Sequence, residues 1–272
     1  MRPPSFSTRL LLLAGLMGLS GCGSNSAPPG RLPPPVVSQP ARDEIPGEHL
    51  DAVAAAHQRA LGLMEQYDYR QAAEAFREVR RLAPNWSPGA VNLAIALLNE
   101  GGVDGEKSNF DESLALLDDV LGSKPNDLRA LFCKGIVLTQ QGHAVEAHSL
   151  FLKVTEIDPL DAASWLWAAN TLTNAEDPTR PIGPSDASRK IELLNRALAI
   201  DPDLASALYP LALAYRMAGQ PDRQREVLER WKRLDPDRPE SVPGPGNVVE
   251  TSYGAMGRHA LIVNPPGLAT IA

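Results

Sequence analysis

The sequence is short of cysteine, aromatic residues and positive charge. Its 272 residues include two cysteines and 5% aromatic residues, and the formal net charge is -7. Because a chain without a basic stripe cannot neutralise a run of phosphates, this balance argues against a nucleic-acid partner. The chain has 43% hydrophobic and 22% charged residues, which is enough apolar material for a sizeable core, and we expect a folded body.

The hydrophobic run at the N-terminus is too short to span a membrane. Leu10–Leu19 is a run of ten residues, whereas a helix that crosses a bilayer needs about 20. Arg2 and Arg9 precede the run, and small residues follow it. A positive flank, a short apolar run and small residues together predict an export signal and not a membrane-spanning helix.

The sequence LSGC, which ends at Cys22, resembles the bacterial lipobox. The resemblance implies that residues 1–21 are a lipoprotein signal peptide and that Cys22 is acylated as the mature N-terminus. More than one acyl chain would anchor the protein stably, since a single chain binds a membrane only marginally. An aspartate in place of Gly23 would have resembled an inner-membrane retention signal, so an outer-membrane location facing the periplasm or the surface is favoured. The alternative is an ordinary secretory signal with Cys22 incidental.

Residues 22–47 are predicted to be a lipid-anchored linker without a core of its own. The stretch from Gly23 to Gly47 carries seven prolines with serine and glycine and has no apolar periodicity. Such a composition is typical of a semi-rigid spacer, which at about 3.1 Å per residue extends to about 70 Å. We therefore expect the folded body to stand away from the membrane.

The body of the chain repeats. Short motifs such as TEIDPL and LAIDPD recur, each after an amphipathic segment that its proline ends. The steps between these prolines are 41, 34, 43 and 34 residues, and the prolines are Pro84, Pro125, Pro159, Pro202 and Pro236. Two of the steps equal the 34-residue period of the tetratricopeptide repeat.

The unit that ends at Pro159 shows the internal pattern best. Gly135 stands where two helices must approach closely, and Gly142 is placed to end the first helix in a left-handed conformation. Three residues four and three apart form one apolar face of the second helix, namely Ala147, Phe151 and Val154. The pattern resembles the tetratricopeptide repeat (TPR) family over residues 48–237.

The resemblance implies an all-α, right-handed TPR solenoid of five helix-turn-helix repeats. The extra residues of the second and fourth units predict inserts near 100–110 and 176–185, between the two helices of those units. In a solenoid such inserts project from one edge. The alternative is an irregular helical bundle whose spacing is coincidental.

The sequence contains no recognisable catalytic or metal-binding constellation. It has no HExxH, CxxCH, GxxxxGK[ST] or GxSxG motif, and His143 and His148 do not share a helical face. With Cys22 acylated, Cys133 has no disulfide partner, and we expect it to be a buried apolar residue. We therefore expect no enzyme, no cofactor and no metal.

A binding groove is the remaining source of function. In TPR folds the first helix of each unit lines the concave face, and matching positions gives ten candidate groove residues. Asn92 and Asn170 are suggestive of the family's carboxylate clamp, but the sequence indicates no basic residues to complete it, so an extended apolar or mixed peptide suits the groove better. For Leu61, Ile95 and Leu213, burial against a neighbouring unit is an equal alternative. The candidates are His57, Leu61, Val91, Ile95, Phe132, Ile136, Leu166, Asn170, Tyr209 and Leu213.

Residues 238–272 form a tail outside the repeats. The tail holds two β-prone runs, NVV and ALIV, which would not be stable as isolated strands. It could cover the exposed face of the last unit, add a strand to a partner's sheet or fray. The sequence YGAMGRHALIV also resembles segments that join TPR arrays to FG-GAP-type β-propellers, which makes a β-propeller protein one candidate partner.

Taken together, these features predict a non-catalytic protein-interaction scaffold anchored by lipid in the bacterial cell envelope. Its partner would be an exported protein or extended peptide, bound through the concave face, the tail or both. Two other roles remain open: an accessory subunit of an envelope enzyme, and an assembly factor that works through its convex face.

The lipid anchor gives the first testable prediction. Cys22→Ser removes the acylated sulfur, so we expect the variant to leave the membrane fraction on cell fractionation, while Cys133→Ser stays in it. Membrane association of the Cys22→Ser variant that survives high salt would contradict the anchor.

Overall fold

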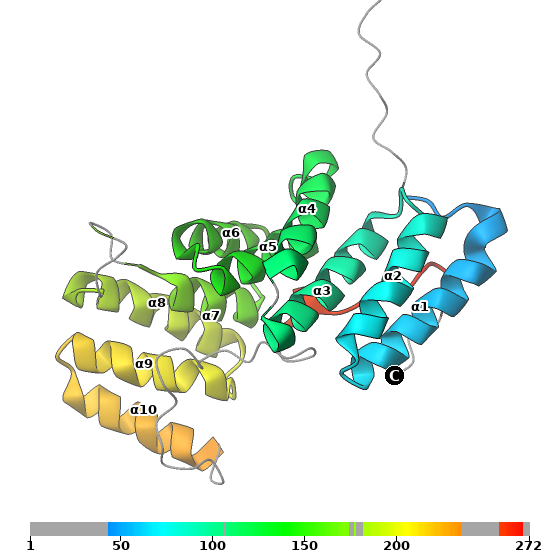
Figure 1. Ribbon diagram of the computed structural model, residues 1–272. Coiled ribbons are helices and arrows are strands. Elements are labelled where there is room, and N and C mark those ends of the chain that lie inside the picture. The colour runs from blue at the N-terminus through cyan, green and yellow to red at the C-terminus, as the bar shows by residue number, and fades with distance from the viewer. Residues whose placement is uncertain (1–42, 106, 174–176, 178–181, 235–255, 269–272) are drawn as a thin grey trace, which may run out of the picture. The chain divides into compact units, whose positions relative to one another are not determined.

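The computed structural model describes residues 43–105, 107–173, 177, 182–234 and 256–268. Within these ranges it contains ten α-helices, two short 3-10 helices and no β-strand (Figure 1). The α-helices form five consecutive pairs whose members pack on each other. This arrangement confirms the all-α fold class with five helix-turn-helix units. The pairs are α1 (Leu50–Glu65) with α2 (Tyr69–Leu82), α3 (Ser87–Asp104) with α4 (Lys107–Ser123), α5 (Leu128–Gln140) with α6 (Ala144–Ile157), α7 (Ala162–Thr171) with α8 (Pro184–Ile200), and α9 (Ala205–Met217) with α10 (Pro221–Leu234).

Aspartates begin several of these helices. The side chains of Asp68, Asp127 and Asp161 accept hydrogen bonds from backbone N–H groups in the first turns of α2, α5 and α7. Such caps satisfy donors that the helix itself leaves unpaired. Gly142, in the turn between α5 and α6, has φ +82°, which confirms the left-handed conformation expected there. The periodic breaks seen in the sequence are therefore real helix boundaries.

The core runs through all five units and joins each pair to the next. Ala147, Phe151 and Val154 are fully buried on α6, as their spacing predicts. The Phe151 ring meets Phe132 of α5 edge to face and stacks on Trp167 of α7, with both centroid distances 5.5 Å. One aromatic side chain therefore links the third unit internally and attaches it to the fourth.

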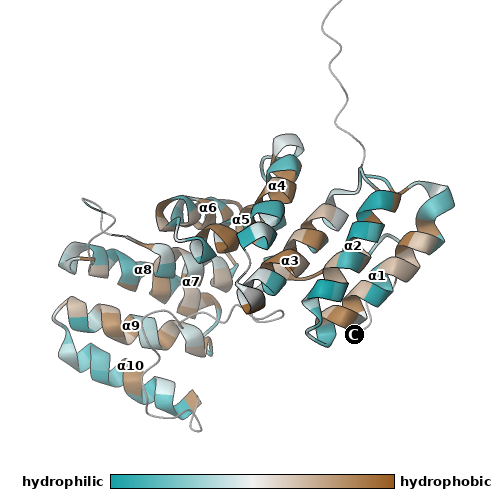
Figure 2. Cartoon of the chain, viewed as in Figure 1, coloured by the Kyte–Doolittle hydropathy of each residue, from teal (hydrophilic) through white to brown (hydrophobic). Residues whose placement is uncertain are grey.

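The last helix already closes the array. None of the residues of α10 is fully buried, and its hydrophilic surface is visible in Figure 2. Val227 and Trp231 pack against the core with one face of the helix, and the other face is polar. A terminal repeat with a polar outer face needs no further cover, so a tail is not required at this end.

The insert of the second unit differs from the expected projecting loop. Residues 99–104 continue α3, which has 18 residues, and α4 begins at Lys107 and has 17. The extra residues thus lengthen both helices of the pair, and Gly105, with φ +70°, makes the turn between them. Gly101 allows the extension to pack, because a Cβ atom there would lie 3.0 Å from the Phe110 ring. Half of the fourth unit's predicted insert, namely residues 176 and 178–181, lies outside the described residues.

The end of the predicted linker belongs to the folded body. Asp43 Oδ1 accepts hydrogen bonds from Ser87 N and Oγ at 2.7 and 2.8 Å, and its carboxylate also pairs with Lys124. Ile45 packs against the core, and Gly47–His49 form a 3-10 turn that leads into α1. Among the residues described, no helix is both long and apolar enough to cross a membrane.

The close approach at Gly135 gives a stability prediction. A Cβ atom at this position would lie 2.7 Å from Phe151 Cζ, whereas one at Gly62, inside α1, would meet nothing within 4 Å. We expect Gly135→Ala to lower the free energy of unfolding by about 1–3 kcal/mol through overpacking. Gly62→Ala should instead raise it by about 0.5–1 kcal/mol, because alanine is the better helix former.

Urea denaturation of the two variants measures both changes. If Gly135→Ala were as stable as Gly62→Ala, the packing of α5 on α6 described above would be wrong.

Candidate peptide-binding groove

The tail occupies the face formed by the first helices of the repeats. Its described part, residues 256–268, is called here the C-terminal segment. Met256 contacts α7, the short helix η2 (Arg258–Ala260) packs on α5, and Asn264 reaches α1. The segment therefore crosses the units in the reverse of their order in the chain, and in Figure 1 it appears in red beside α3 and α1.

Side chains of three consecutive units bind the main chain of this segment. Trp167 Nε1 of α7 donates to the Met256 carbonyl at 3.2 Å, and Cys133 Sγ of α5 lies 3.6 Å from the carbonyl of His259. Asn92 Nδ2 of α3 donates to the Val263 carbonyl at 2.8 Å. The groove thus holds main-chain atoms, which every extended peptide possesses.

Asn92 and Arg129 form the centre of these contacts. Asn92 also accepts a hydrogen bond from Val263 N at 3.0 Å, so its amide pairs with both main-chain groups of one residue. Arg129 Nη2 of α5 donates to the Leu261 carbonyl at 2.7 Å and to Asn92 Oδ1 at 2.8 Å. Asn92 is fully buried under the segment. A buried amide left without these partners would be costly, so the groove favours an occupied state.

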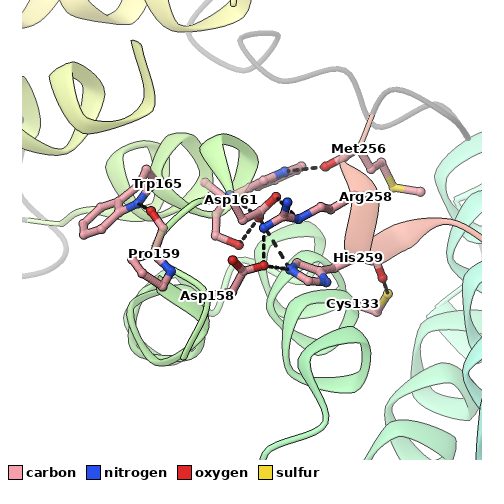
Figure 3. A network of polar contacts seen from close by, with 10 residues as sticks. Cys133, Asp158, Pro159, Asp161, Trp165, Met256, Arg258 and His259 are labelled. Atoms are coloured by element: carbon pink, nitrogen blue, oxygen red, sulfur yellow. Dashed lines mark hydrogen bonds and ion pairs between the residues drawn. The ribbon is translucent and has the colours of Figure 1, made fainter. Parts of the chain in front are cut away.

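An acidic pair holds the basic residues of the segment (Figure 3). Asp158 precedes α7 and pairs with Arg258, and its Oδ2 lies 3.0 Å from His259 Nε2. Arg258 Nε also lies 3.2 Å from Asp161 Oδ1. Burial opposes ionisation of Asp158, but the hydrogen bonds from Arg258 and His259 outweigh it and lower the pKa of the carboxyl. Asp158 is therefore ionised at neutral pH and complements Arg258 of the segment.

Apolar contacts complete the site. Met256 and Ala260 are each 1% exposed, and the His259 ring lies on Phe132 with centroids 5.9 Å apart. By contrast, Leu261 and Val263 point partly outward, at 42% and 37% exposure. The first half of the segment thus buries its side chains in the site, whereas Leu261 and Val263 are bound mainly through their backbone.

The structure divides the ten predicted groove residues into three groups. His57 and Phe132 contact the C-terminal segment: His57 Nε2 lies 2.9 Å from Asn264 Oδ1, and Phe132 packs on His259. Four others lie in the hydrophobic core, and four are half-buried. The core residues are Val91, Ile95, Ile136 and Leu166, and the half-buried ones are Leu61, Asn170, Tyr209 and Leu213. Tyr209 packs on Trp231 of α10, with ring centroids 5.3 Å apart.

On α3, α5 and α7, the main chain of the segment is bound one residue further along the helix than predicted. Asn92, Cys133 and Trp167 directly follow three predicted residues, Val91, Phe132 and Leu166. One residue turns a helix by about 100°, which moves a side chain from the interface between units to the open face. All three residues occupy the same position in their repeats, and this shared position is the sequence signal that could have identified them.

Two further expectations need correction. The groove does contain a basic residue, Arg129, which lies on the first turn of α5. The described part of the tail does not cover the last unit, and its ALIV run forms no strand there. It lies instead on α1, α3, α5 and α7. The buried amide and the acidic groups at those helices need hydrogen-bonding or charged partners, whereas the polar surface of α10 needs none. The NVV run lies outside the described residues.

Cys133 is buried, as expected. Burial raises the pKa of its thiol to about 12. A thiol with such a pKa carries almost no thiolate at neutral pH, so it is a poor nucleophile.

His57 makes the site sensitive to pH. Burial lowers the pKa of His57, although the hydrogen bond with Asn264 opposes the shift, and the ring otherwise faces Phe76 and Trp86. Because the pKa is lowered in the folded state, stability is full above the ordinary value of about 6.5 and falls as the unfolded state takes up the proton.

As the pH is lowered from about 7.5 to about 5, we therefore expect the thermal midpoint to fall, and to fall less in His57→Gln. His143→Gln, on an exposed turn, is the control and should keep the slope of the natural chain. Calorimetry at several pH values checks this. An unchanged slope in His57→Gln would contradict the buried neutral imidazole.

Comparison with known proteins agrees with this geometry. A tetratricopeptide repeat model matches residues 98–162 and 191–239. MamA from Desulfovibrio magneticus RS-1, residues 41 to the end, is 18% identical with a TM-score of 0.56, and the match covers 69% of this chain and 97% of that one. Another MamA crystal structure is 13% identical with a TM-score of 0.52, covering 71% and 99%. No curated protein matches the chain. The chain therefore has the fold of a TPR solenoid, with tetratricopeptide repeats in the two matched stretches.

Proposed function

We propose that this protein is a non-catalytic scaffold that holds an extended segment of an exported partner protein in the groove of its TPR units. The observation that carries the proposal is the row of side chains from α3, α5 and α7 that binds main-chain atoms of the C-terminal segment. Tetratricopeptide repeats are protein-interaction modules, and such a row suits that role. Because main-chain contacts tolerate different side chains, the same row suits a partner segment.

Several polar groups that could serve chemistry have structural roles. His57 contacts Asn264, His259 contacts Asp158, and His148 Nδ1 lies 2.8 Å from the Ala168 carbonyl. The raised pKa of Cys133 disfavours a thiolate nucleophile. These contacts support binding over catalysis.

The location is proposed from the sequence. The lipobox-like LSGC and the seven prolines that follow it support a lipid on Cys22 and a spacer between the membrane and the body. The tethered groove would then meet partners in the envelope, with the outer membrane favoured by Gly23.

Crosslinked purification from native membranes tests the proposed function. The double variant Asn92→Ala/Arg129→Ala removes charged and neutral hydrogen bonds at the centre of the groove, so we expect recovery of a near-stoichiometric envelope partner to fall about tenfold or more. The matched control is Glu78→Ala/Arg81→Ala, which removes an exposed ion pair on α2 and should leave recovery unchanged.

The pattern of loss separates the possible roles. Loss in the control pair alone would overturn groove binding in favour of an assembly factor that uses its convex face. Equal recovery with both pairs, or no envelope partner at all, would also contradict the proposal. Thermal midpoints of the variants show whether a loss of partner recovery is caused by unfolding.

A further inference from the structure

We propose that the groove selects segments in which a glycine is followed directly by an arginine, and that residues 256–264 are an internal occupant which such a partner segment displaces. The inference rests on the proposed function and specifies the chemistry of the partner. It follows from the part of the groove where Asp158 and Asp161 bind the side chains of Arg258 and His259.

The glycine position is restricted by both conformation and space. Gly257 has φ +120° and ψ 166°, a region that only glycine occupies readily. A Cβ atom there would lie 2.6 Å from the Ala163 Cβ atom and 3.4 Å from Phe132 Cζ. Since both neighbours belong to helices packed in the array, neither can move aside cheaply. A segment with any other residue at this point cannot keep the same path.

The arginine position is restricted by a carboxylate, that of Asp161, whose orientation is fixed by groups outside the segment. Asp161 caps α7, with Oδ2 accepting hydrogen bonds from Ser164 N at 2.9 Å and Ser164 Oγ at 2.5 Å. This leaves Oδ1 directed at the guanidinium of Arg258, 3.2 Å from its Nε. The Asp161 side chain is only 5% exposed, and a buried carboxylate needs a cation nearby. Preorganised carboxylates of this kind favour a basic segment.

The remaining positions are less restricted. Ala260 is buried and calls for a small residue, whereas Leu261 and Val263 are more than one-third exposed. Beyond Ala260 the groove binds carbonyl groups through Arg129 and Asn92. The sequence that the groove selects is therefore short. It is a glycine, an arginine, any residue that can lie beside Asp158, and a small residue, followed by extended chain.

The natural occupant sets the binding affinity that any partner segment must exceed. It is joined to α10 through residues 235–255, which is 21 residues, and a covalently joined ligand on a short connection competes at an effective concentration that reaches the mM range. A free segment with equal contacts would bind only weakly. A partner must therefore carry further contacts, or the occupant must be weakened.

Weakening the occupant in the full chain provides the test. The protein carries Cys22→Ser so that it can be handled without lipid, and the probe is a fluorescent peptide with the sequence of residues 256–266. With Arg258→Glu in the chain, the natural peptide should bind about tenfold or more tightly than it does to the chain with its natural tail. Leu261→Ser, at a partly exposed position, is the matched control and should bind the peptide as the natural chain does.

Two peptide variants test the selectivity itself. Against the Arg258→Glu chain, peptides with Gly257→Ala or Arg258→Glu should each bind about tenfold or more weakly than the natural peptide. In a chain that instead carries Asp158→Arg with its natural Arg258, the internal segment is repelled, and the Arg258→Glu peptide should bind more tightly than the natural peptide. Equal binding of all three peptides would overturn the selectivity while leaving the groove function intact.

The rate at which Cys133 is labelled is an independent measure of whether the C-terminal segment occupies the groove. In the Cys22→Ser chain Cys133 is the single thiol, and it lies beneath the His259 carbonyl. Arg258→Glu should speed its labelling by a maleimide severalfold at a temperature well below the thermal midpoint of the variant, and the natural peptide should slow it again.

Equal labelling rates with and without the Arg258→Glu change would overturn the internal occupant. So would a dimer of the natural chain in sedimentation that Arg258→Glu dissociates, because the segment would then belong to a second copy. Loss of the native partner in the Asn92→Ala/Arg129→Ala chain, together with failure of the peptide experiments, would leave the proposed function standing without this inference.

Discussion

The groove depends on the close packing of each first helix between its own partner helix and the neighbouring unit. The helix α5 approaches α6 so closely at Gly135 that a Cβ atom there would meet the Phe151 ring at 2.7 Å. Phe151 in turn stacks on Trp167 of α7. Packing on two sides leaves one narrow strip of each first helix open, and this strip carries Asn92, Cys133 and Trp167. The positions of these three contacts follow from that constraint.

A polar strip in such a place needs an occupant. Asn92 is fully buried, and both of its polar atoms are satisfied by the main chain of Val263. Without the segment the same groups would be solvated, so the segment exchanges water for main-chain hydrogen bonds to Asn92. An extended segment restores the hydrogen bonds and covers Phe132 at the same time. The strip is thus suited to a peptide more than to a small molecule.

Charged contacts fix the register of the C-terminal segment along the groove. The chain as a whole is acidic, with a net charge of -7, yet the C-terminal segment presents adjacent basic residues, Arg258 and His259, to Asp158 and Asp161. Main-chain contacts alone would permit several registers along the groove. The acidic pair and the glycine position fix one of them, which is why the specific part of the site lies at α7 and the tolerant part at α3.

The sequence by itself determined the helices and most of their ends, because proline breaks, capping aspartates and the spacing of Ala147, Phe151 and Val154 act within a few residues. The pairing of the helices was an implication of the resemblance to tetratricopeptide repeats. The sequence also identified His57 and Phe132 as groove candidates. It did not distinguish the strip of Asn92, Cys133 and Trp167 from the buried positions of Val91 and Leu166, because one residue along a helix separates the open face from the interface between units. Only the tertiary structure decided that the tail fills this groove, since its hydrogen-bond partners lie from 89 residues earlier in the chain, at Trp167, to 207 residues earlier, at His57. Contacts at such separations depend on how the units pack, which no local pattern specifies.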